Sequence, residues 1–498
     1  MGIIEKQATT NTIYSYLGAF LGFITVMWLP HLLSTDENGL VRILVSVSVL
    51  LAQIGNLGFS SVTIRFFPYF KNKEKGHHGF LFYGIIISLV GFLLCWITFL
   101  VFEKRIIADN QEKSKLLVEY LFYLMPLTLF TLFFNLFDNY LRASYNSVIG
   151  LFTKEFLQRI LILIVLALYF FNFISFSAFV LLYVTSVCTP TVLLMYSIIK
   201  NNEWHVKPIR GFISKDLRNE ILKLSFYTIL SGSAGALIAN IDTIMVNQML
   251  GLSKTGVYGI AFYFGTIIAI PARSLYRIST SIVAEAFKVN DLEKINRLYN
   301  KSCNGQLTVG LLLFIGIWIN IDNIMTLLPP EYESGKYVIL FISAGNLIDM
   351  GTGINSIIVL TSKHYRYDAY FMFSVVLITI LTNYLLIPVY GITGSAIATA
   401  ITVATYNILR GLLIFYKYKM QPYDVNTIKL ITIAIASFLI GYFIPKLNNS
   451  YMDILMRSSI VTLLFIFSIL KSEASPEINN KIKKLYYAFG STNNRSPK

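Results

Sequence analysis

The chain alternates long apolar stretches with short polar loops along almost its whole length. A helix that crosses the hydrocarbon core of a bilayer needs about 20 mostly apolar residues, and about fourteen stretches meet this length. They lie near 12–33, 40–64, 79–101, 116–137, 150–171, 174–199, 222–250, 256–286, 304–328, 335–361, 369–388, 391–416, 428–444 and 453–470. The pattern predicts an all-α integral membrane protein.

Composition and charge agree with this prediction. Hydrophobic residues make up 55% of the chain and charged residues only 13%, whereas soluble domains have roughly 25% charged residues. The net charge of +15 could suggest a nucleic-acid partner, but Lys and Arg concentrate in alternate loops, such as 65–75, 200–223, 288–301 and 417–429. This asymmetry indicates orientation. We therefore expect no nucleic acid, and we expect both termini in the cytoplasm.

The hydropathy pattern repeats after a shift of about 217 residues, which places spans 1–2 on spans 7–8 and Gly39 on Gly256. Six spans in each repeat give both repeats the same orientation, so two parallel six-helix lobes around a central cavity are predicted. Such a layout favours transport by alternating access over catalysis. The predicted divisions are an N-lobe (1–199), a basic cytoplasmic linker (200–221), a C-lobe (222–416), spans 13–14 (417–470) and a basic cytoplasmic tail (471–498).

Four arginines stand well inside predicted spans: Arg159, Arg273, Arg277 and Arg410. A charge in hydrocarbon is costly and marks a functional hypothesis by default. Arginine keeps its charge and offers a planar set of donors suited to phosphate. The same selection would also serve contacts between helices, through carbonyl groups or ion pairs.

Arg273 and Arg277 lie one helical turn apart, so they share a helix face. We expect Arg273 to hold a diphosphate inside the membrane and Arg277 to meet it at the inner mouth, although an ion pair for Arg273 and snorkelling of Arg277 to the interface remain open. Arg159 could line the cavity or form a structural pair. Arg410 is expected to be an interfacial anchor.

Two carboxylates, Asp242 and Asp349, also lie deep in spans. Burial favours protonation of a carboxylate, so either could couple transport to an ion such as H⁺ or Na⁺; a fixed salt bridge to an arginine is the alternative. We find no metal-ligand spacing among the histidines and cysteines, and no phosphate-binding glycine loop, zinc-protease motif or nucleophile elbow. No metal, cofactor or enzymatic activity is expected.

Several segments resemble the polysaccharide-exporter branch of the multidrug/oligosaccharidyl-lipid/polysaccharide (MOP) superfamily, the Wzx-type O-antigen flippases. The segment 240–246 (NIDTIMV), followed by Gly256-Val257-Tyr258, is similar to that family's seventh-to-eighth-span pattern, and 386–399 (LIPVYGITGSAIAT) to its eleventh-to-twelfth-span hairpin. Leu-Gly-Phe at 57–59 followed by Arg65 resembles the end of its second span. The resemblance adds Arg65 to the diphosphate-binding candidates, although a positive-inside anchor is the other interpretation.

The resemblance implies a flippase for an undecaprenyl-diphosphate-linked oligosaccharide, which acts in the bacterial inner membrane during O-antigen, lipopolysaccharide or other polysaccharide biosynthesis. Its expected partners are the lipid-linked oligosaccharide, membrane lipids, a coupling ion and polysaccharide polymerase machinery. A cation or drug exporter of the same superfamily is the first alternative, yet the first span, 12–33, contains no acid that would suit a cationic cargo. A membrane glycosyltransferase or polymerase is less favoured because the outer loops are short.

Overall fold

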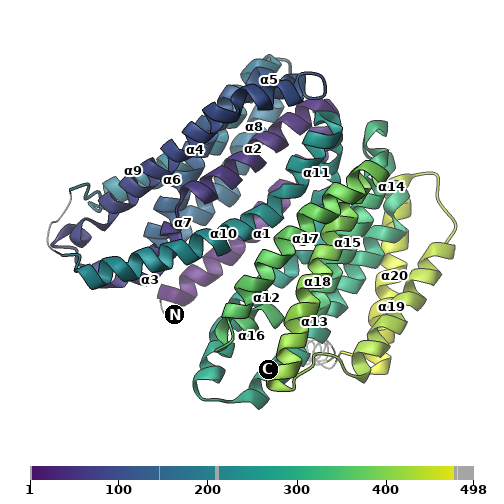
Figure 1. The fold of residues 1–498 in the computed structure, drawn as a ribbon. Coiled ribbons are helices and arrows are strands. Elements are labelled where there is room, and N and C mark those ends of the chain that lie inside the picture. The colour runs from purple at the N-terminus through teal and green to yellow at the C-terminus, as the bar shows by residue number, and fades with distance from the viewer. Residues whose placement is uncertain (1–2, 145, 208–211, 476–478, 480–498) are drawn as a thin grey trace, which may run out of the picture. The chain divides into compact units, whose positions relative to one another are not determined.

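The structure is a computed structural model that describes residues 3–144, 146–207, 212–475 and 479. Some side chains within helices, those of Arg273 and Arg277 among them, are outside this description. All regular elements of the described residues are helices (Figure 1). They form two compact units, Met1–Ile260 and Ala261–Lys498, and each is treated by itself.

The first unit contains the helices up to the seventh predicted span and the beginning of the eighth. Its elements are α1 (Ile3–Leu32), α2 (Thr35–Gly55), α3 (Phe59–Phe70), η1 (Gly76–Gly79), α4 (Phe80–Asn110), α5 (Lys115–Tyr120), η2 (Leu121–Tyr123), α6 (Leu124–Ala143), α7 (Val148–Leu151), η3 (Phe152–Leu157), α8 (Gln158–Phe170), α9 (Phe176–Lys200) and α10 (Lys215–Leu250). Helix α11 (Leu252–Thr266) begins in this unit and ends in the next.

The second unit holds the remaining helices. They are η4 (Ile267–Ala269), α12 (Ile270–Lys288), α13 (Leu292–Ile319), α14 (Ile321–Thr326), η5 (Pro330–Gly335), α15 (Lys336–Gly351), α16 (Asn355–Thr361), α17 (Arg366–Tyr390), α18 (Ile392–Tyr418), α19 (Val425–Phe443) and α20 (Ser450–Ser472). Helix α18 packs against α15 and α17, while α19 and α20 pair with each other and pack against α13 (Figure 1).

The second span is interrupted, which differs from the continuous span expected over 40–64. Helix α2 begins with a capping box in which Ser34 accepts from the Glu37 backbone while the Glu37 side chain accepts from Ser34 N. Such boxes satisfy amide groups that the first helical turn leaves unpaired. Helix α2 ends at Gly55, and Gly58 takes a left-handed conformation (φ 77°) before α3 begins. A side chain is strained at such an angle, which favours glycine at position 58, and Leu57 before it is left-handed as well (φ 49°).

Glycines allow helix backbones to touch in the first unit. A Cβ on Gly91 of α4 would lie 1.7 Å from the carbonyl oxygen of Gly55, and a Cβ on Gly256 of α11 would lie 2.0 Å from that of Thr35. Small residues permit this close approach of helices in membranes. Gly256 and Gly39, which the hydropathy shift predicts to be equivalent, come close together, since that same Cβ would lie 3.0 Å from Gly39 N.

Eleven helices of the described residues are long and apolar enough to cross a membrane, or up to twelve if the bent pair Pro330–Gly351 and Asn355–Thr361 is one span. The predicted count of fourteen is thus not confirmed. The two other expected spans, 150–171 and 222–250, are not among these helices: no single helix covers 150–171, and the side chains of residues 230–234 within 222–250 are outside the described residues. Around 150–171 the chain is divided among α7, η3 and α8, and 222–250 lies within α10.

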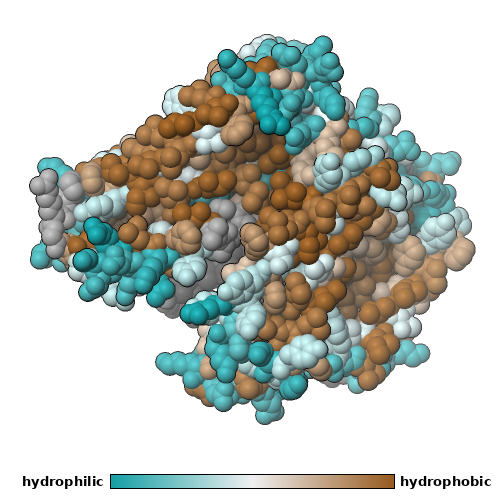
Figure 2. Space-filling view, in the orientation of Figure 1, coloured by the Kyte–Doolittle hydropathy of each residue, from teal (hydrophilic) through white to brown (hydrophobic). Residues whose placement is uncertain are grey.

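The surface fits a bilayer. On the face shown in Figure 2, apolar side chains cover the middle lengths of the helices in each unit, and polar side chains gather near helix ends. Large exposed apolar residues recur along α4 and α17, for example Leu93, Ile97, Phe373 and Leu381. A soluble protein rarely exposes such extended apolar surface, so the chain is a multi-pass membrane protein.

The boundary between the two compact units, at residues 260 and 261, lies inside the eighth predicted span and not in the linker at 200–221. The division into six-span lobes, a linker and two additional spans stays a prediction. Residues 208–211 of the linker, and most of the tail predicted over 471–498, are outside the described residues.

Candidate binding sites within the helices

The eighth predicted span is interrupted just before the first two candidate arginines, Arg273 and Arg277. Helix α11 ends at Thr266, a 3-10 turn follows in η4, and α12 starts with Pro271 in its first turn. Proline is tolerated there because its missing N–H would have no partner in the helix. Arg273 and Arg277 both lie on α12, one turn apart, but their side chains are outside the described residues. Their role in diphosphate binding stays a prediction.

Arg159 forms an ion pair with Glu155 one turn earlier in the same span. Its Nη2 lies 2.9 Å from Glu155 Oε2, and 30% of the Arg159 side chain remains exposed. Glu155 belongs to η3, a π-helical segment. Such segments are rare in proteins, and those that occur are frequently at functional sites. Only Nη2 of Arg159 donates to Glu155, so the other N–H groups of Arg159 can still contact a ligand.

Arg65 lies on α3, where its side chain is exposed. Its guanidinium carbon is 5.7 Å from the centre of the Phe66 ring. An exposed arginine near a helix end fits an interfacial anchor as well as an entry contact for an anion. Neither interpretation is tested by this arrangement.

Asp242 lies in a buried polar group of the first unit. The Tyr258 hydroxyl donates to Asp242 Oδ2 at 3.1 Å. Tyr258 is 0% exposed and Asp242 is 4% exposed. The stem of Arg42 runs past Gly259, where an added Cβ would lie 3.2 Å from Arg42 Cγ. Tyr258 and Tyr183 both lie close enough to Arg42 for electrostatic interaction.

The sequence interpretation overlooked Arg42. The second span was expected to begin near residue 40, which puts Arg42 close to its predicted edge, whereas α2 begins five residues earlier, at Thr35. The Ser34 capping box was the signal that could have corrected this boundary. Arg42 adds a cation to the same region as Arg159, since Tyr183 lies within electrostatic range of both arginines.

Asp349 lies in a polar network of the second unit. It accepts hydrogen bonds from the Tyr276 hydroxyl (3.2 Å) and from Asn407 Nδ2 (3.0 Å). The Asn407 amide oxygen in turn accepts from Thr352 at 2.7 Å and from Asn355 at 2.8 Å. This network joins α12, α15, α16 and α18, and the two donors to Asp349 are neutral groups.

Arg410 is buried, which differs from the interfacial anchor expected. Its Nε donates to Asp368 Oδ1 at 2.8 Å, and the side chains are 8% and 9% exposed. The Tyr406 hydroxyl donates to the same carboxylate at 3.2 Å and accepts from Arg410. Asp368 begins α17 and Arg410 is near the end of α18, so the antiparallel hairpin brings them together.

A second buried ion pair, also unexpected, ties α20 to its neighbours. Arg457 Nε donates to Asp453 Oδ2 at 2.8 Å, and Arg457 Nη1 donates to the Gly441 carbonyl of α19 at 3.1 Å. Asn323 Nδ2 donates to the same Asp453 oxygen at 2.6 Å. The pair therefore fixes the α19–α20 hairpin against the remainder of its unit.

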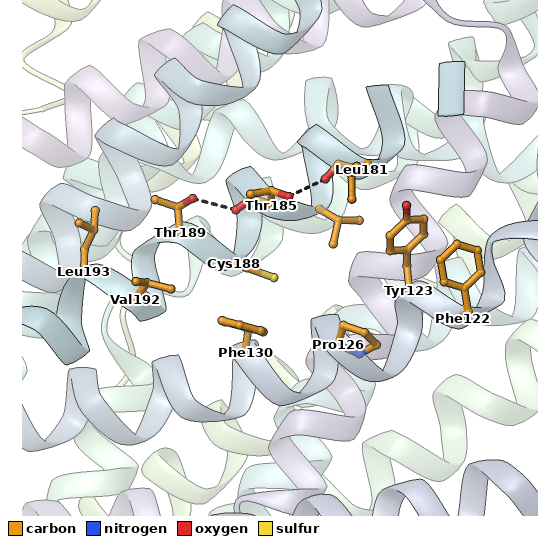
Figure 3. Close-up of a pocket in the computed structure, with 11 residues that line it drawn as sticks. Phe122, Tyr123, Pro126, Phe130, Leu181, Thr185, Cys188, Thr189, Val192 and Leu193 are labelled. Carbon is orange, nitrogen blue, oxygen red and sulfur yellow. Dashed lines mark hydrogen bonds between the residues drawn. The ribbon is translucent and has the colours of Figure 1, made fainter. Parts of the chain in front are cut away.

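An apolar groove of about 520 Å³ runs between α6 and α9 in the first unit (Figure 3). Phe130, Pro126 and Cys188 are among its lining residues. The hydroxyls of Thr185 and Thr189 in its wall donate to the carbonyls of Leu181 and Thr185 within α9. Since those hydroxyls are satisfied internally, the groove suits hydrocarbon and offers no charged ligand to a metal. Among the described residues, no group of His, Cys, Asp and Glu could hold a metal ion.

Comparison with known proteins gives one family and one fold. The sequence profile described as "Polysaccharide biosynthesis protein" matches residues 4–275. No curated protein matches the chain.

Among solved structures, the lipid II flippase MurJ in an inward closed conformation has a TM-score of 0.75 at 16% identity, over 92% of this chain and 98% of that chain. An inward-facing multidrug resistance transporter of the MATE family, in the MOP superfamily, has a TM-score of 0.64 at 13% identity, over 83% and 98%. A MOP superfamily transporter from Pyrococcus furiosus has 0.55 at 13%, over 83% and 96%. At these identities the likeness is one of fold.

Proposed function

Because the chain belongs to the polysaccharide biosynthesis protein family, we propose that it flips an undecaprenyl-diphosphate-linked oligosaccharide from the cytoplasmic to the periplasmic leaflet of a bacterial inner membrane. The family match is the observation that carries this proposal. The MOP-type fold supports it, since the neighbours of that fold are transporters and flippases. We propose the cytoplasmic side for both termini.

The decisive experiment is deletion of the gene in its own host. We expect the lipid-linked glycan to accumulate in the cytoplasmic leaflet and the surface polysaccharide to be lost. Complementation by the wild-type chain should reverse both effects. If the glycan does not accumulate and the strain instead becomes sensitive to organic cations, the exporter function known in the MATE neighbour replaces this proposal.

The proposed cargo contact is a set of arginines that hold the diphosphate: Arg273 first, then Arg277, Arg159 and Arg65. A diphosphate cannot cross hydrocarbon without such partners, and guanidinium groups bind phosphate through several hydrogen bonds. We expect Arg273→Ala to abolish complementation and Arg273→Lys to retain part of it. Full activity of the alanine variant would remove Arg273 from this role.

Asp242 and Asp349 are the proposed ion-coupling residues. Both lie inside helices of apolar composition and accept hydrogen bonds from tyrosine hydroxyls. The two donors to Asp349, Tyr276 and Asn407, are neutral groups, and such a carboxylate can take up a proton or Na⁺ without losing those hydrogen-bond partners to an arginine. Asn variants of each should be assayed for flipping with and without an imposed H⁺ or Na⁺ gradient. Coupling through either residue fails if the gradient stimulates its variant as strongly as the wild type.

Alternating access requires contacts that form on one side and separate during the cycle. The hydroxyls of Thr35 and Ser253 are 2.7 Å apart at the beginnings of α2 and α11, and these ends are extracytoplasmic in the proposed topology. We propose that this contact opens when cargo leaves. The double variant Thr35→Cys with Ser253→Cys places two thiols at this contact and tests whether a disulfide can lock it. It should block flipping under oxidation and release it under reduction, with each single cysteine as control.

A further inference from the structure

A cluster of charged residues lies where α6 and η3 meet α8, at the proposed cytoplasmic end of the first unit. It contains the basic residues Arg142, Lys154 and Arg159 and the acids Asp138 and Glu155. Arg142 Nη2 is 2.7 Å from Asp138 Oδ2, and Arg159 Nη2 is 2.9 Å from Glu155 Oε2. Two ion pairs, each between residues one helical turn apart, thus account for four of the five charges.

Lys154 is the fifth. Among the described side chains, no carboxylate lies within 4.0 Å of its ammonium group. The contact found is with an aromatic ring, since Nζ lies 4.5 Å from the centre of Phe134 on α6. The side chain is exposed, yet it is near enough to Asp138, Glu155 and Arg142 to interact electrostatically. The cluster therefore presents one positive charge that no acid neutralises.

The backbone around Lys154 is held in an unusual geometry. Residues Phe152–Leu157 form the π-helical η3, which packs against α1, α8 and α9. A Cβ on Gly18 of α1 would lie 2.6 Å from the carbonyl oxygen of Glu155, so only a glycine lets α1 approach this closely. π-helical turns are rare and occur frequently at functional sites.

We infer that Lys154 is a further anion-binding residue, which receives the phosphate groups of the lipid-linked cargo on the cytoplasmic side. The inference rests on the proposed function for the identity of the cargo. An ammonium group offers three donors and binds phosphate oxygen well. Phe134 holds the ammonium by a cation–π contact without neutralising its charge. Arg142 and Arg159 each keep donors that their carboxylate does not use, and they are available to a second phosphate.

A purely structural role would give a different result. If Lys154 only anchored η3 to Phe134, then its loss would lower thermal stability and leave anion affinity unchanged. If it binds phosphate, then its loss weakens an affinity that depends on salt, because salt screens interactions between accessible charges. Arginine at this position should restore binding, since it too is a cation that binds phosphate and stacks on aromatic rings.

The test uses the full chain in detergent with farnesyl diphosphate as a short lipid diphosphate and with inorganic diphosphate in a parallel arm. We expect Lys154→Gln to weaken farnesyl diphosphate binding about tenfold at low salt, the scale of one charge-assisted hydrogen bond. Lys154→Arg should stay within about threefold of wild type, and Phe134→Leu, which keeps the apolar volume, should fall between the two. Lys200→Gln, an exposed lysine at the end of α9, is the matched control and should bind as wild type.

The outcomes separate the two proposals. Equal farnesyl diphosphate affinity of wild type and Lys154→Gln overturns the role of Lys154 and leaves the proposed function intact. A wild-type chain that binds neither ligand overturns the anionic cargo, and this inference with it. Loss of thermal stability in both Lys154→Gln and Lys154→Arg, without a difference in affinity between them, shows an anchor and also overturns the inference. If inorganic diphosphate binds as tightly as farnesyl diphosphate, then the anion that Lys154 binds is free phosphate and not a lipid headgroup, and the inference is overturned.

Discussion

The two units handle internal charge in different ways. In the second unit, Arg410 and Asp368 come from different helices and are 8% and 9% exposed. In the first unit, Arg159 and Glu155 come from neighbouring turns of one span and are 30% and 34% exposed. A buried pair between helices fixes their packing, whereas an accessible pair within one helix fixes little. The comparison indicates that the Arg410–Asp368 pair serves structure, whereas Arg159 is available to a ligand.

The largest predicted effect tests this difference directly. Arg410→Gln leaves the Asp368 carboxylate buried without its cation, so we expect a loss of about 3 kcal/mol or more in the free energy of unfolding. Arg159→Gln should cost no more than about 1 kcal/mol, as exposed pairs do. Thermal unfolding of the two variants in the same detergent measures both. Similar losses in the two variants would contradict the division between structural and available charges.

The order of the two variants should be reversed when flipping activity is measured in place of stability. Where Arg410→Gln still folds at low temperature, its flipping activity per folded molecule should remain. Arg159→Gln should unfold as wild type and yet flip poorly. A double variant, Arg410→Leu with Asp368→Leu, separates the cost of an unpaired charge from the loss of the pair, because replacing both partners by apolar groups is often nearly neutral.

Part of this contrast could be predicted from the sequence. Hydropathy gave the all-α membrane fold and the approximate places of most spans, because a span needs about 20 apolar residues whatever it packs against. The Arg410–Asp368 pair was also within reach. Spans 11 and 12 form an antiparallel hairpin, so the beginning of one and the end of the other must meet. Asp368 was placed one residue outside its predicted span, and the pair was therefore overlooked.

Other features depend on packing that no hydropathy pattern contains. The break after Gly55 lies within an apolar stretch, and the left-handed backbone of Leu57 and Gly58 shows it. The π-helical turn that holds Lys154 has no sequence signature, so Lys154 was counted among the loop cations. The resemblance to O-antigen flippases predicted the superfamily, since it relied on residue types at turns. The binding roles of Arg273 and Arg277 stay predictions.

A smaller loss of stability is expected when one of the neutral hydrogen-bond donors to Asp349 is removed. Tyr276→Phe removes the hydrogen bond from the Tyr276 hydroxyl to Asp349 and leaves the one from Asn407. We expect a loss of about 1 kcal/mol in the free energy of unfolding, measured against Tyr384→Phe, whose side chain is exposed. If Tyr276→Phe leaves stability unchanged and instead alters the response of flipping to an ion gradient, this network is functional. A structural role would then be assigned to the buried pairs of Arg410 and Arg457 and not to Asp349.

The smallest effect concerns a charge of the second unit that is accessible. Asp322 on α14 accepts from Lys336 at 2.6 Å and from Lys446 at 2.7 Å. The hydrogen bond from Lys336, with that from Lys446, holds the pKa of Asp322 below its ordinary value. A lowered pKa means that the contribution of Asp322 to stability is fully present above the unfolded pKa of about 3.9 and is lost as pH falls through the folded value.

Asp322→Asn should therefore unfold at nearly the wild-type temperature at pH 3 and slightly below it at pH 7. Because the Asp322 side chain is 49% exposed, the difference should stay within about 1 kcal/mol and shrink in high salt. Melting curves at the two pH values, with and without salt, measure it. A loss at pH 7 as large as that of Arg410→Gln would mean that accessibility does not decide how strongly a charge in this protein contributes to its stability.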